Sequence, residues 1–228
     1  MEHAAALPAA TVPTAIVFAG SGTVTAAVRA HLPEAADVIA ADSGLAVANA
    51  LGVHVDLLVG DLDSVEPSAV EIAEASGTTV ARHPAEKDAT DLELALDAAV
   101  ERGARGVVMV DGGGDRLDHL LANLLLLASA RYAGVDVTAF AGTAHVGVAR
   151  GGDPPLPIAG EPGSLVTLLA VGGPARGIVT NGLRYPLRDE ELAPGTSRGV
   201  SNELVEPVAT IELASGVLLV VQPFGSAR

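Results

Sequence analysis

Residues 57–76 read LLVGDLDSVEPSAVEIAEAS, and this stretch decides how the first half of the chain is expected to fold. It opens with a short apolar run at 57–59, continues through a polar turn, and ends in a helical pattern that starts at Pro67. A short apolar run is typical of a buried strand, and proline is favoured at the first position of a helix. The stretch therefore predicts a strand, a turn rich in carboxylates and a helix, in that order.

The same order of strand, turn and helix recurs before and after this stretch. Further short apolar runs, each expected to be a strand, lie at 15–19, 38–41, 78–81, 106–110 and 135–140. Helical patterns lie between them, at 25–31, 45–51, 91–102 and 117–131. Short apolar strands that alternate with helices predict a parallel sheet covered on both faces, so we expect a Rossmann-like α/β domain.

The composition changes near Gly151. Residues 151–157 read GGDPPLP, which breaks any helix and is typical of a turn or linker. Beyond it the chain has no helical period, but β-rich runs lie at 164–171, 177–180, 208–213 and 217–221. Short strands separated by Gly, Pro and Asn turns predict an antiparallel sandwich or barrel. We therefore expect two domains, an α/β domain at 12–148 and an all-β domain at 156–224.

Charge and composition exclude several classes of function. The 228 residues carry a formal net charge of −15, which argues against nucleic acid and anionic membranes as main partners, because both need a Lys/Arg footprint. The chain has no cysteine, so disulfides, thiolate zinc sites and cysteine nucleophiles are excluded. Its start lacks the basic region of a signal peptide, and the most apolar stretch, 120–130, is shorter than the roughly 20 residues of a membrane span. A cytoplasmic protein is expected.

Carboxylates follow three of the expected strands closely, as Asp42, Asp61 and Asp111. In open α/β sheets, ligands bind at the carboxyl ends of the strands, so we expect these side chains to gather at one edge. Asp61 and Asp63 are two residues apart and, in an extended segment, point the same way. Converging carboxylates repel one another, and Mg²⁺ would relieve the repulsion. The alternative is a turn that uses Asp and Ser only for its shape.

Residues 87–91, KDATD, come directly before an expected helix. Thr90 or Asp91 is expected to be its N-cap. Lys87 can bind phosphate oxygens as a point charge, whereas Asp88 or Asp91 can complete a metal shell or accept a proton. Capping explains one of these residues but not the group.

Residues 111–119, DGGGDRLDH, form a glycine-rich turn before another expected helix. Glycines let the backbone approach a ligand, and the helix can aim its first N–H groups at an anion. Arg116 can bind phosphate bidentately. His119 is either a structural helix-end residue or a direct contact. Asn123, one turn further on the same face, either orients His119 or is a buried, satisfied amide.

Taken together, these motifs resemble the thiamin pyrophosphokinase family. The matching segments, in chain order, are 41–44 (ADSG), 60–64 (GDLDS), 83–91 (HPAEKDATD), 112–119 (GGGDRLDH), 182–187 (GLRYPL) and 201–203 (SNE). The resemblance implies transfer of a pyrophosphoryl group from the co-substrate ATP to the hydroxyl of thiamin, giving thiamin diphosphate and AMP. It also implies an α/β catalytic domain, a β-sandwich and a homodimer whose thiamin site lies at the dimer interface.

The resemblance assigns roles to particular residues. Asp61, Asp63 and Asp91 correspond to ligands of Mg²⁺, and with Lys87 and Asp88 they form the expected catalytic group. The metal and triphosphate would be held by Asp88, Thr90 and Asp91, and the nucleotide would be lined by Asp42, Ser43, Gly44, Gly113 and Arg116. Asp118 and Ser201 correspond to thiamin contacts, with Asn202 supporting that loop. If a base takes part, Asp88 and Asp91 are the candidates.

One departure from the family concerns the acceptor. Some members place a Trp against thiamin, and this chain has none. Tyr185 is a candidate replacement, unless it packs inside the β domain. Two other functions remain open, a pyrophosphokinase for another alcohol such as a hydroxymethylpterin, and a non-catalytic regulator that binds nucleotide or thiamin.

Overall fold

The computed structural model describes residues 13–20, 22–34, 37–114 and 116–224. Ser21 and Asp115, which belong to the glycine-rich segments, lie outside the described residues. Within the described part, the chain forms two compact units. Residues 13–126 and 134–142 are called here the α/β unit, and residues 127–133 and 143–224 the β unit.

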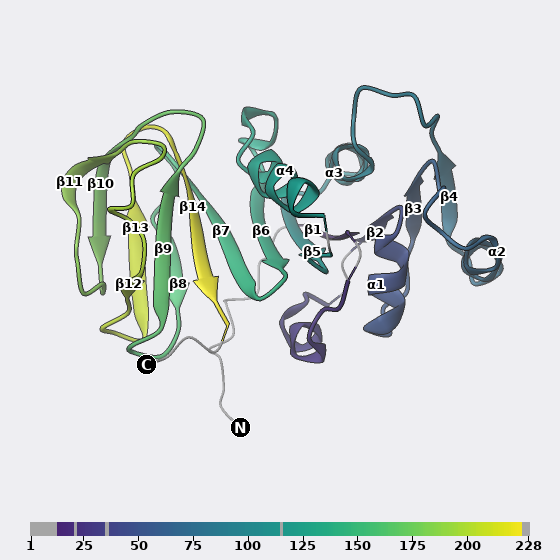
Figure 1. Ribbon diagram of the computed structural model, residues 1–228, viewed down its shortest axis with the longest axis horizontal. Coiled ribbons are helices and arrows are strands. Elements are labelled where there is room, and N and C mark those ends of the chain that lie inside the picture. Colours follow the sequence, from purple (N-terminus) through teal and green to yellow (C-terminus); the bar gives the residue numbers. More distant parts are fainter. Residues whose placement is uncertain (1–12, 21, 35–36, 115, 225–228) are drawn as a thin grey trace. The chain divides into compact units, whose positions relative to one another are not determined.

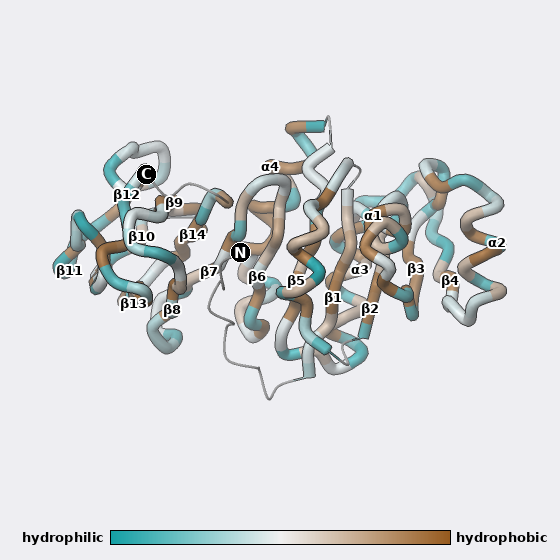
Figure 2. The backbone as a smooth tube through the Cα atoms, turned by 90° about the horizontal axis from the view of Figure 1, so that it is seen from below, coloured by the Kyte–Doolittle hydropathy of each residue, from teal (hydrophilic) through white to brown (hydrophobic). Residues whose placement is uncertain are grey.

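The α/β unit contains a parallel sheet with the strand order β6-β5-β1-β2-β3-β4. The strands are β1 (Thr14–Ala19), β2 (Asp37–Ala41), β3 (Leu57–Gly60), β4 (Thr79–Arg82), β5 (Gly106–Asp111) and β6 (Asp136–Ala141). Hydrophobic residues dominate β1, β2 and β3 (Figure 2), because both faces of a parallel sheet are covered. The predicted parallel sheet is confirmed.

Helices cover the two faces of this sheet. They are the 3₁₀ helix η1 (Ala26–His31), α1 (Gly44–Ala50), α2 (Pro67–Ala75), α3 (Asp91–Glu101) and α4 (Leu117–Leu127). α1 contacts β1 and β2 from one side, and α3 packs over β1, β2 and β3 from the other (Figure 1). The segment 25–31, predicted as a helix, is a short 3₁₀ helix. The helix predicted at 117–131 ends at Leu127, and a second 3₁₀ helix, η2 (Ala130–Tyr132), follows.

The strand order reverses at β1, which explains why distant motifs meet. β2, β3 and β4 follow one another on one side of β1, and α3 then returns the chain to β5 on the other side. Phe18 and Leu58 are fully buried in the core that joins the strands to α1. The carboxyl ends of β1, β2, β3 and β5 therefore lie together, at the switch point where α/β sheets bind ligands.

The β unit is a pair of antiparallel sheets. One has the order β12-β9-β14-β7, and the other has the order β11-β10-β13-β8. Its strands are β7 (Ala144–Arg150), β8 (Leu156–Ala159), β9 (Leu165–Ala170), β10 (Ala175–Asn181), β11 (Arg188–Leu192), β12 (Asn202–Glu203), β13 (Val208–Glu212) and β14 (Val217–Pro223). Val166 and Leu218 from one sheet share a buried core with Ile178 and Ile211 from the other. The predicted sandwich is confirmed.

Several strands of the β unit differ from the expectation. β7, β8, β11 and β12 were not predicted, and β8 begins inside the expected linker. Residue 148, the expected end of the first domain, lies within β7, which pairs with β14 along its whole length. The pairing explains why β7 belongs to the β unit.

Candidate active site

Asp42 follows β2 in a tight left-handed turn. Its φ is 45°, a value that Asp tolerates better than most residues, and its N–H donates to the Val59 carbonyl at 2.9 Å. Gly44 follows, and a Cβ at this position would lie 2.2 Å from the Phe18 carbonyl oxygen. Glycine is therefore required for α1 to approach β1. Sequence reasoning assigned Gly44 only to the nucleotide, but the structure gives it a packing role.

The turn after β3 carries Asp61 and Asp63, but it is not extended. Leu62 between them is buried and has a φ of 63°, and the Asp63 N–H donates to Asp61 Oδ1 at 3.2 Å. Asp61 and Asp63 therefore do not lie in an extended segment, and the prediction that they point the same way for that reason is wrong. Both carboxylates still face one region, because the buried Leu62 reverses the chain between them.

Three carboxylates converge at this turn. One oxygen each of Asp42, Asp61 and Asp63 lies within 4.8 Å of the others. Gly60 leaves room for Asp42 and for Asp91, because a Cβ there would lie 3.2 Å from Asp42 Cβ and 3.2 Å from Asp91 Oδ1. The structure thus places Asp42 beside Asp61 and Asp63, whereas sequence reasoning had assigned it to the nucleotide.

Lys87 joins the fourth carboxylate to this group. Its Nζ lies 3.0 Å from Asp61 Oδ2 and 3.2 Å from Asp91 Oδ1. The hydrogen bond from Lys87 lowers the pKa of Asp61, and the Asp63 N–H lowers it further. Burial lowers the pKa of Lys87, but the hydrogen bond to Asp61 and the negative charges of Asp91 and Asp61 outweigh burial and raise the pKa above its ordinary value.

The oxygens of this group fit a hard divalent cation. Asp42 Oδ1 is buried and has no hydrogen-bond partner among the described residues. Burial raises the pKa of Asp42, hydrogen bonds from the Ser43 N–H and the Ser64 side chain oppose this, and the charges of Asp91 and Asp61 add to the rise. Each carboxylate is an oxygen ligand of the kind that Mg²⁺ prefers, and a cation would neutralise their repulsion. The shape of the turn alone does not account for an unpaired, buried carboxylate oxygen.

The loop before α3 supplies its own cap. Thr90 Oγ1 accepts a hydrogen bond from the Glu93 N–H at 3.2 Å, so Thr90 is the N-cap and Asp91 is the first helical residue. Of the two capping candidates, Thr90 is the one observed. The cap fixes where Asp91 enters the helix and so helps to aim it at Lys87. Asp88 is exposed on the same loop.

A buried carboxylate organises the glycine-rich turn. Asp111 ends β5, and its two oxygens accept hydrogen bonds from the Gly113 N–H and from Asn123 Nδ2, both at 2.8 Å. Gly20 passes so close that a Cβ there would lie 2.3 Å from Asp111 Oδ1. Asn123 is thus a buried, satisfied amide. From the sequence, Asp111 was noted only as a residue at the end of a strand. Asn123, a polar residue in the apolar part of the following helix, was the available sign that Asp111 anchors this turn.

Arg116 and Asp118, expected to bind different ligands, bind each other. Arg116 Nε and Nη2 donate to the two oxygens of Asp118 at 2.9 and 2.7 Å. The hydrogen bonds from Arg116 hold the pKa of Asp118 well below its usual range. Both side chains are exposed, and so is His119, so the pair stands open to solvent.

In the β unit, Asn202 holds the backbone of Tyr185. Asn202 is buried; its Oδ1 accepts from the N–H groups of Tyr185 and Glu203 at 3.0 and 2.9 Å, and its Nδ2 donates to the Tyr185 carbonyl at 2.8 Å. The Tyr185 side chain is 63% exposed, so it does not pack inside the β unit. Ser201, with a φ of 57°, is exposed beside Asn202.

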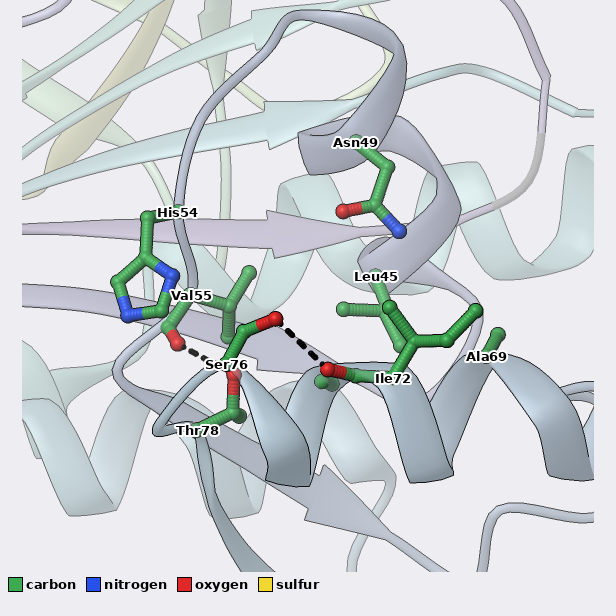
Figure 3. A pocket seen from close by; sticks show the side chains of 9 residues that line it. Leu45, Asn49, His54, Val55, Ala69, Ile72, Ser76 and Thr78 are labelled. Carbon is green, nitrogen blue, oxygen red and sulfur yellow. Dashed lines mark hydrogen bonds between the residues drawn. The ribbon is translucent and has the colours of Figure 1, made fainter.

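A separate pocket lies between α1 and α2 (Figure 3). It measures about 170 Å³, and its rim includes His54, Ile72 and Thr78. Thr78 and Val55 precede β4 and β3, so the pocket lies at the amino ends of these strands, opposite the carboxylates. None of the predicted site residues lines it.

Carboxylates that fit a divalent cation, a lysine and a glycine-rich turn are each suited to binding phosphate oxygens, directly or through the metal. The α/β unit brings all three to the ligand-binding edge of its sheet, which points to an enzyme that acts on phosphate groups. Two family models match the chain, "Thiamin pyrophosphokinase, catalytic domain" over residues 29–139 and "Thiamin pyrophosphokinase, vitamin B1 binding domain" over residues 157–218. The chain belongs to the thiamin pyrophosphokinase family. The family and the enzyme class expected from the sequence are confirmed.

Individual relatives agree with this assignment. A Bacillus subtilis (strain 168) protein named thiamine pyrophosphokinase is 26% identical over 163 residues, covering 72% of this chain and 76% of that protein. The crystal structure of thiamin pyrophosphokinase from Geobacillus thermodenitrificans is 27% identical, covers 94% of this chain and 99% of its own, and has a TM-score of 0.76. The Bacillus subtilis enzyme structure, 23% identical over 92% of this chain and 98% of its own, gives a TM-score of 0.78 and supports the fold. Among the helices of the described residues, none is both long and apolar enough to span a membrane.

Proposed function

We propose that this chain transfers the pyrophosphoryl group of ATP to the hydroxyl of thiamin in a Mg²⁺-dependent reaction, giving thiamin diphosphate and AMP. The observation that carries the proposal is the convergence of Asp42, Asp61 and Asp63 around a buried, unpaired carboxylate oxygen at the ligand-binding edge of the sheet. The presence of both family domains supports thiamin as the acceptor.

The metal would be held by Asp61, Asp63 and Asp91, with Asp42 at the same centre. When bound, Mg²⁺ supplies positive charge to phosphate oxygens as charge develops on them. The carboxylates position that charge, and the thiamin hydroxyl attacks the β-phosphorus while AMP leaves. Catalysis then rests mainly on positioning and electrostatics.

The proton of the thiamin hydroxyl needs an acceptor or a path to water. Asp88 and Asp91 are the candidates, and Asp91 is already paired with Lys87 at 3.2 Å. Asp88 is exposed on the loop before α3, so it is the proposed acceptor.

Nucleotide contacts are proposed along the same edge of the sheet. Ser43 and Gly44 open α1, Thr90 opens α3, and Gly113 brings the backbone of the glycine-rich turn close to a ligand. Arg116 would bind phosphate bidentately after its exposed pair with Asp118 opens. Asp118, released from that pair, is proposed as a thiamin contact.

The β unit is proposed to bind thiamin through the segment that Asn202 organises. Ser201 is exposed beside it, and Tyr185 presents an aromatic ring whose backbone is held at both its N–H and its carbonyl. A ring held this way can stack on a heteroaromatic ligand at low entropic cost. Tyr185 is therefore proposed to take the place of the absent Trp.

We further propose that the enzyme is a homodimer. α4 exposes Leu117, Leu121 and Leu125, four residues apart, to 66%, 52% and 55%. Leucines at this spacing form one apolar stripe, and a stripe of this kind on a soluble protein is typical of an association surface. Sedimentation should show a dimer that Leu121→Glu dissociates. A dimer unchanged by this substitution would rule out α4 as the interface.

The central experiment follows AMP and product mass after purified protein is incubated with ATP, Mg²⁺ and a panel of alcohols. AMP formation should require both Mg²⁺ and thiamin, with a product of the mass of thiamin diphosphate. No AMP with thiamin would contradict the proposed reaction, and AMP with a hydroxymethylpterin would favour the pterin pyrophosphokinase. The cytoplasmic location stays a prediction.

A further inference from the structure

Lys87 is the only lysine of the chain, which otherwise uses arginine for its permanent positive charges. It lies on the loop between β4 and α3, at the carboxylate site. Lysine at this position places a compact ammonium, rather than a guanidinium, beside Asp61 and Asp91. The two side chains differ in how firmly they hold carboxylates, because arginine binds them in a fixed bidentate fork and lysine does so as a mobile point charge.

The Lys87 ammonium is surrounded by oxygens. Its Nζ contacts Asp61 Oδ2 at 3.0 Å, Asp91 Oδ1 at 3.2 Å and the Pro84 carbonyl at 3.1 Å. Two of the three N–H donors of the ammonium go to Asp61 and the Pro84 carbonyl, and Asp91 is held as an ion pair. The two carboxylates come from different elements, the turn after β3 and the start of α3, and Lys87 joins them.

The same two carboxylates are proposed ligands of Mg²⁺. Metal held by Asp61 and Asp91 would lie within a few ångströms of the ammonium, where two positive charges repel strongly in a partly desolvated site. The side chains of Lys87 and Asp61 are only 14% and 17% exposed, so water screens this repulsion incompletely. A metal ion and Lys87 therefore compete for these oxygens.

We propose that Lys87 is a displaceable internal counter-ion. It neutralises Asp61 and Asp91 before the metal binds, leaves these oxygens when the metal takes them, and keeps the Pro84 carbonyl as its anchor. The flexible stem then turns the ammonium toward the phosphate oxygens of the incoming nucleotide. This inference rests on the proposed magnesium site and adds an exchange of one cation for another within it.

The first test compares two charge-removing variants. Lys87→Met keeps the length of the stem and removes the competitor, so it should bind Mg²⁺ roughly five- to tenfold more tightly, as followed by the amide shifts of Gly60 and Asp63 during titration. Arg102→Met is the matched control, because Arg102 pairs with Asp37, whose strand β2 starts at the opposite edge of the sheet. It should bind Mg²⁺ with the wild-type affinity. Equal affinity for Mg²⁺ in Lys87→Met and Arg102→Met would show that Lys87 does not compete with the metal.

The second test needs no substitution. Lysine labelled with ¹⁵N at Nζ gives a single signal in this chain, because no other lysine contributes. Mg²⁺ alone should shift this signal and speed its exchange with water as the two carboxylates are lost as partners. If Mg²⁺ binds and the Lys87 signal stays unchanged, the exchange is wrong while the magnesium site stands. If the wild-type protein binds no Mg²⁺, both the magnesium site and the exchange are wrong.

Discussion

The carboxylate turn of the α/β unit and the Asn202–Tyr185 segment of the β unit treat their polar groups in opposite ways. In the first, Asp61 and Asp91 share the Lys87 ammonium, and Asp42 Oδ1 has no hydrogen-bond partner among the described residues. In the second, Asn202 uses both its amide oxygen and its amide nitrogen, in bonds of 2.8 to 3.0 Å. One region is left ready for a cation, and the other is already complete.

The polar groups of the two regions therefore affect the stability of the folded chain in different ways. Lys87 offsets the charges of Asp61 and Asp91, whereas the charged form of Asp42, whose pKa burial raises, destabilises the folded chain. A buried amide with every atom satisfied stabilises the fold and makes it rigid. The first region is thus proposed to bind its ligand through charge, whereas the second presents the exposed Tyr185 ring from a fixed backbone.

The largest expected effect follows from removing one carboxylate of the turn. Asp61→Asn should lower kcat by roughly 1000-fold or more, because the proposed metal loses a charged ligand. AMP release in the presence of thiamin measures the loss, and thermal unfolding should show an intact fold. Glu66→Gln is the matched control, since it removes the same charge from an exposed residue that makes no side-chain cap for α2. Near-normal turnover of Asp61→Asn would show that Asp61 is not a ligand of the proposed metal.

The second prediction concerns the completed region. Asn202→Ala leaves the backbone groups of Tyr185 and Glu203 without their buried partner, so it should lower the free energy of unfolding by about 2–4 kcal/mol. Asn181→Ala, which loses one exposed contact to Thr210 at 3.3 Å, should cost less than about 1 kcal/mol in the same urea titration. Equal losses of the free energy of unfolding in the two variants would show that the Asn202 hydrogen bonds stabilise the fold no more than an exposed contact does.

Substitution of Tyr185 should weaken the binding of thiamin without changing the stability of the fold. Tyr185→Ala should raise the KM for thiamin about tenfold, the loss expected for one aromatic contact. Unfolding should change by less than about 0.5 kcal/mol, because the side chain is exposed. Tyr185→Phe keeps the ring and should retain the wild-type KM. A KM unaffected in both variants would place thiamin elsewhere.

The sequence predicted the regular part of this molecule well. Buried parallel strands are continuous apolar runs, so β1, β2, β3 and β5 were recognisable without any contact information. β11, with the residues RDEEL, lies in an edge position and carries few apolar residues, and it was missed for that reason. β12 is only two residues long and exists through its pairing with β9.

The site was predicted as a set of residues but not as a set of contacts. Spacing and strand-end placement were enough to indicate that carboxylates gather at one edge. The pairing of Lys87 with both Asp61 and Asp91, and of Arg116 with Asp118, depends on side-chain directions that no local pattern encodes. The left-handed backbone of Leu62 is equally hidden, because a buried leucine is not expected at a φ of 63°.

The smallest expected effect is a gain in stability. Burial raises the pKa of Asp42, so its stabilising contribution is complete below the unfolded value of 3.8 and is lost as the pH rises through the higher folded value. Asp42→Asn removes the charge and still tolerates the left-handed φ of 45°, so without metal it should be more stable than the wild type at pH 7. The gain should be small, at most about 0.5 kcal/mol, as is typical of a partly exposed substitution, and it should vanish below pH 3.8. Urea unfolding at both pH values measures it. A less stable Asp42→Asn at pH 7 would mean that the hydrogen bonds from Ser43 and Ser64 outweigh burial at this carboxylate, and the contrast between the two regions would then fail at this residue.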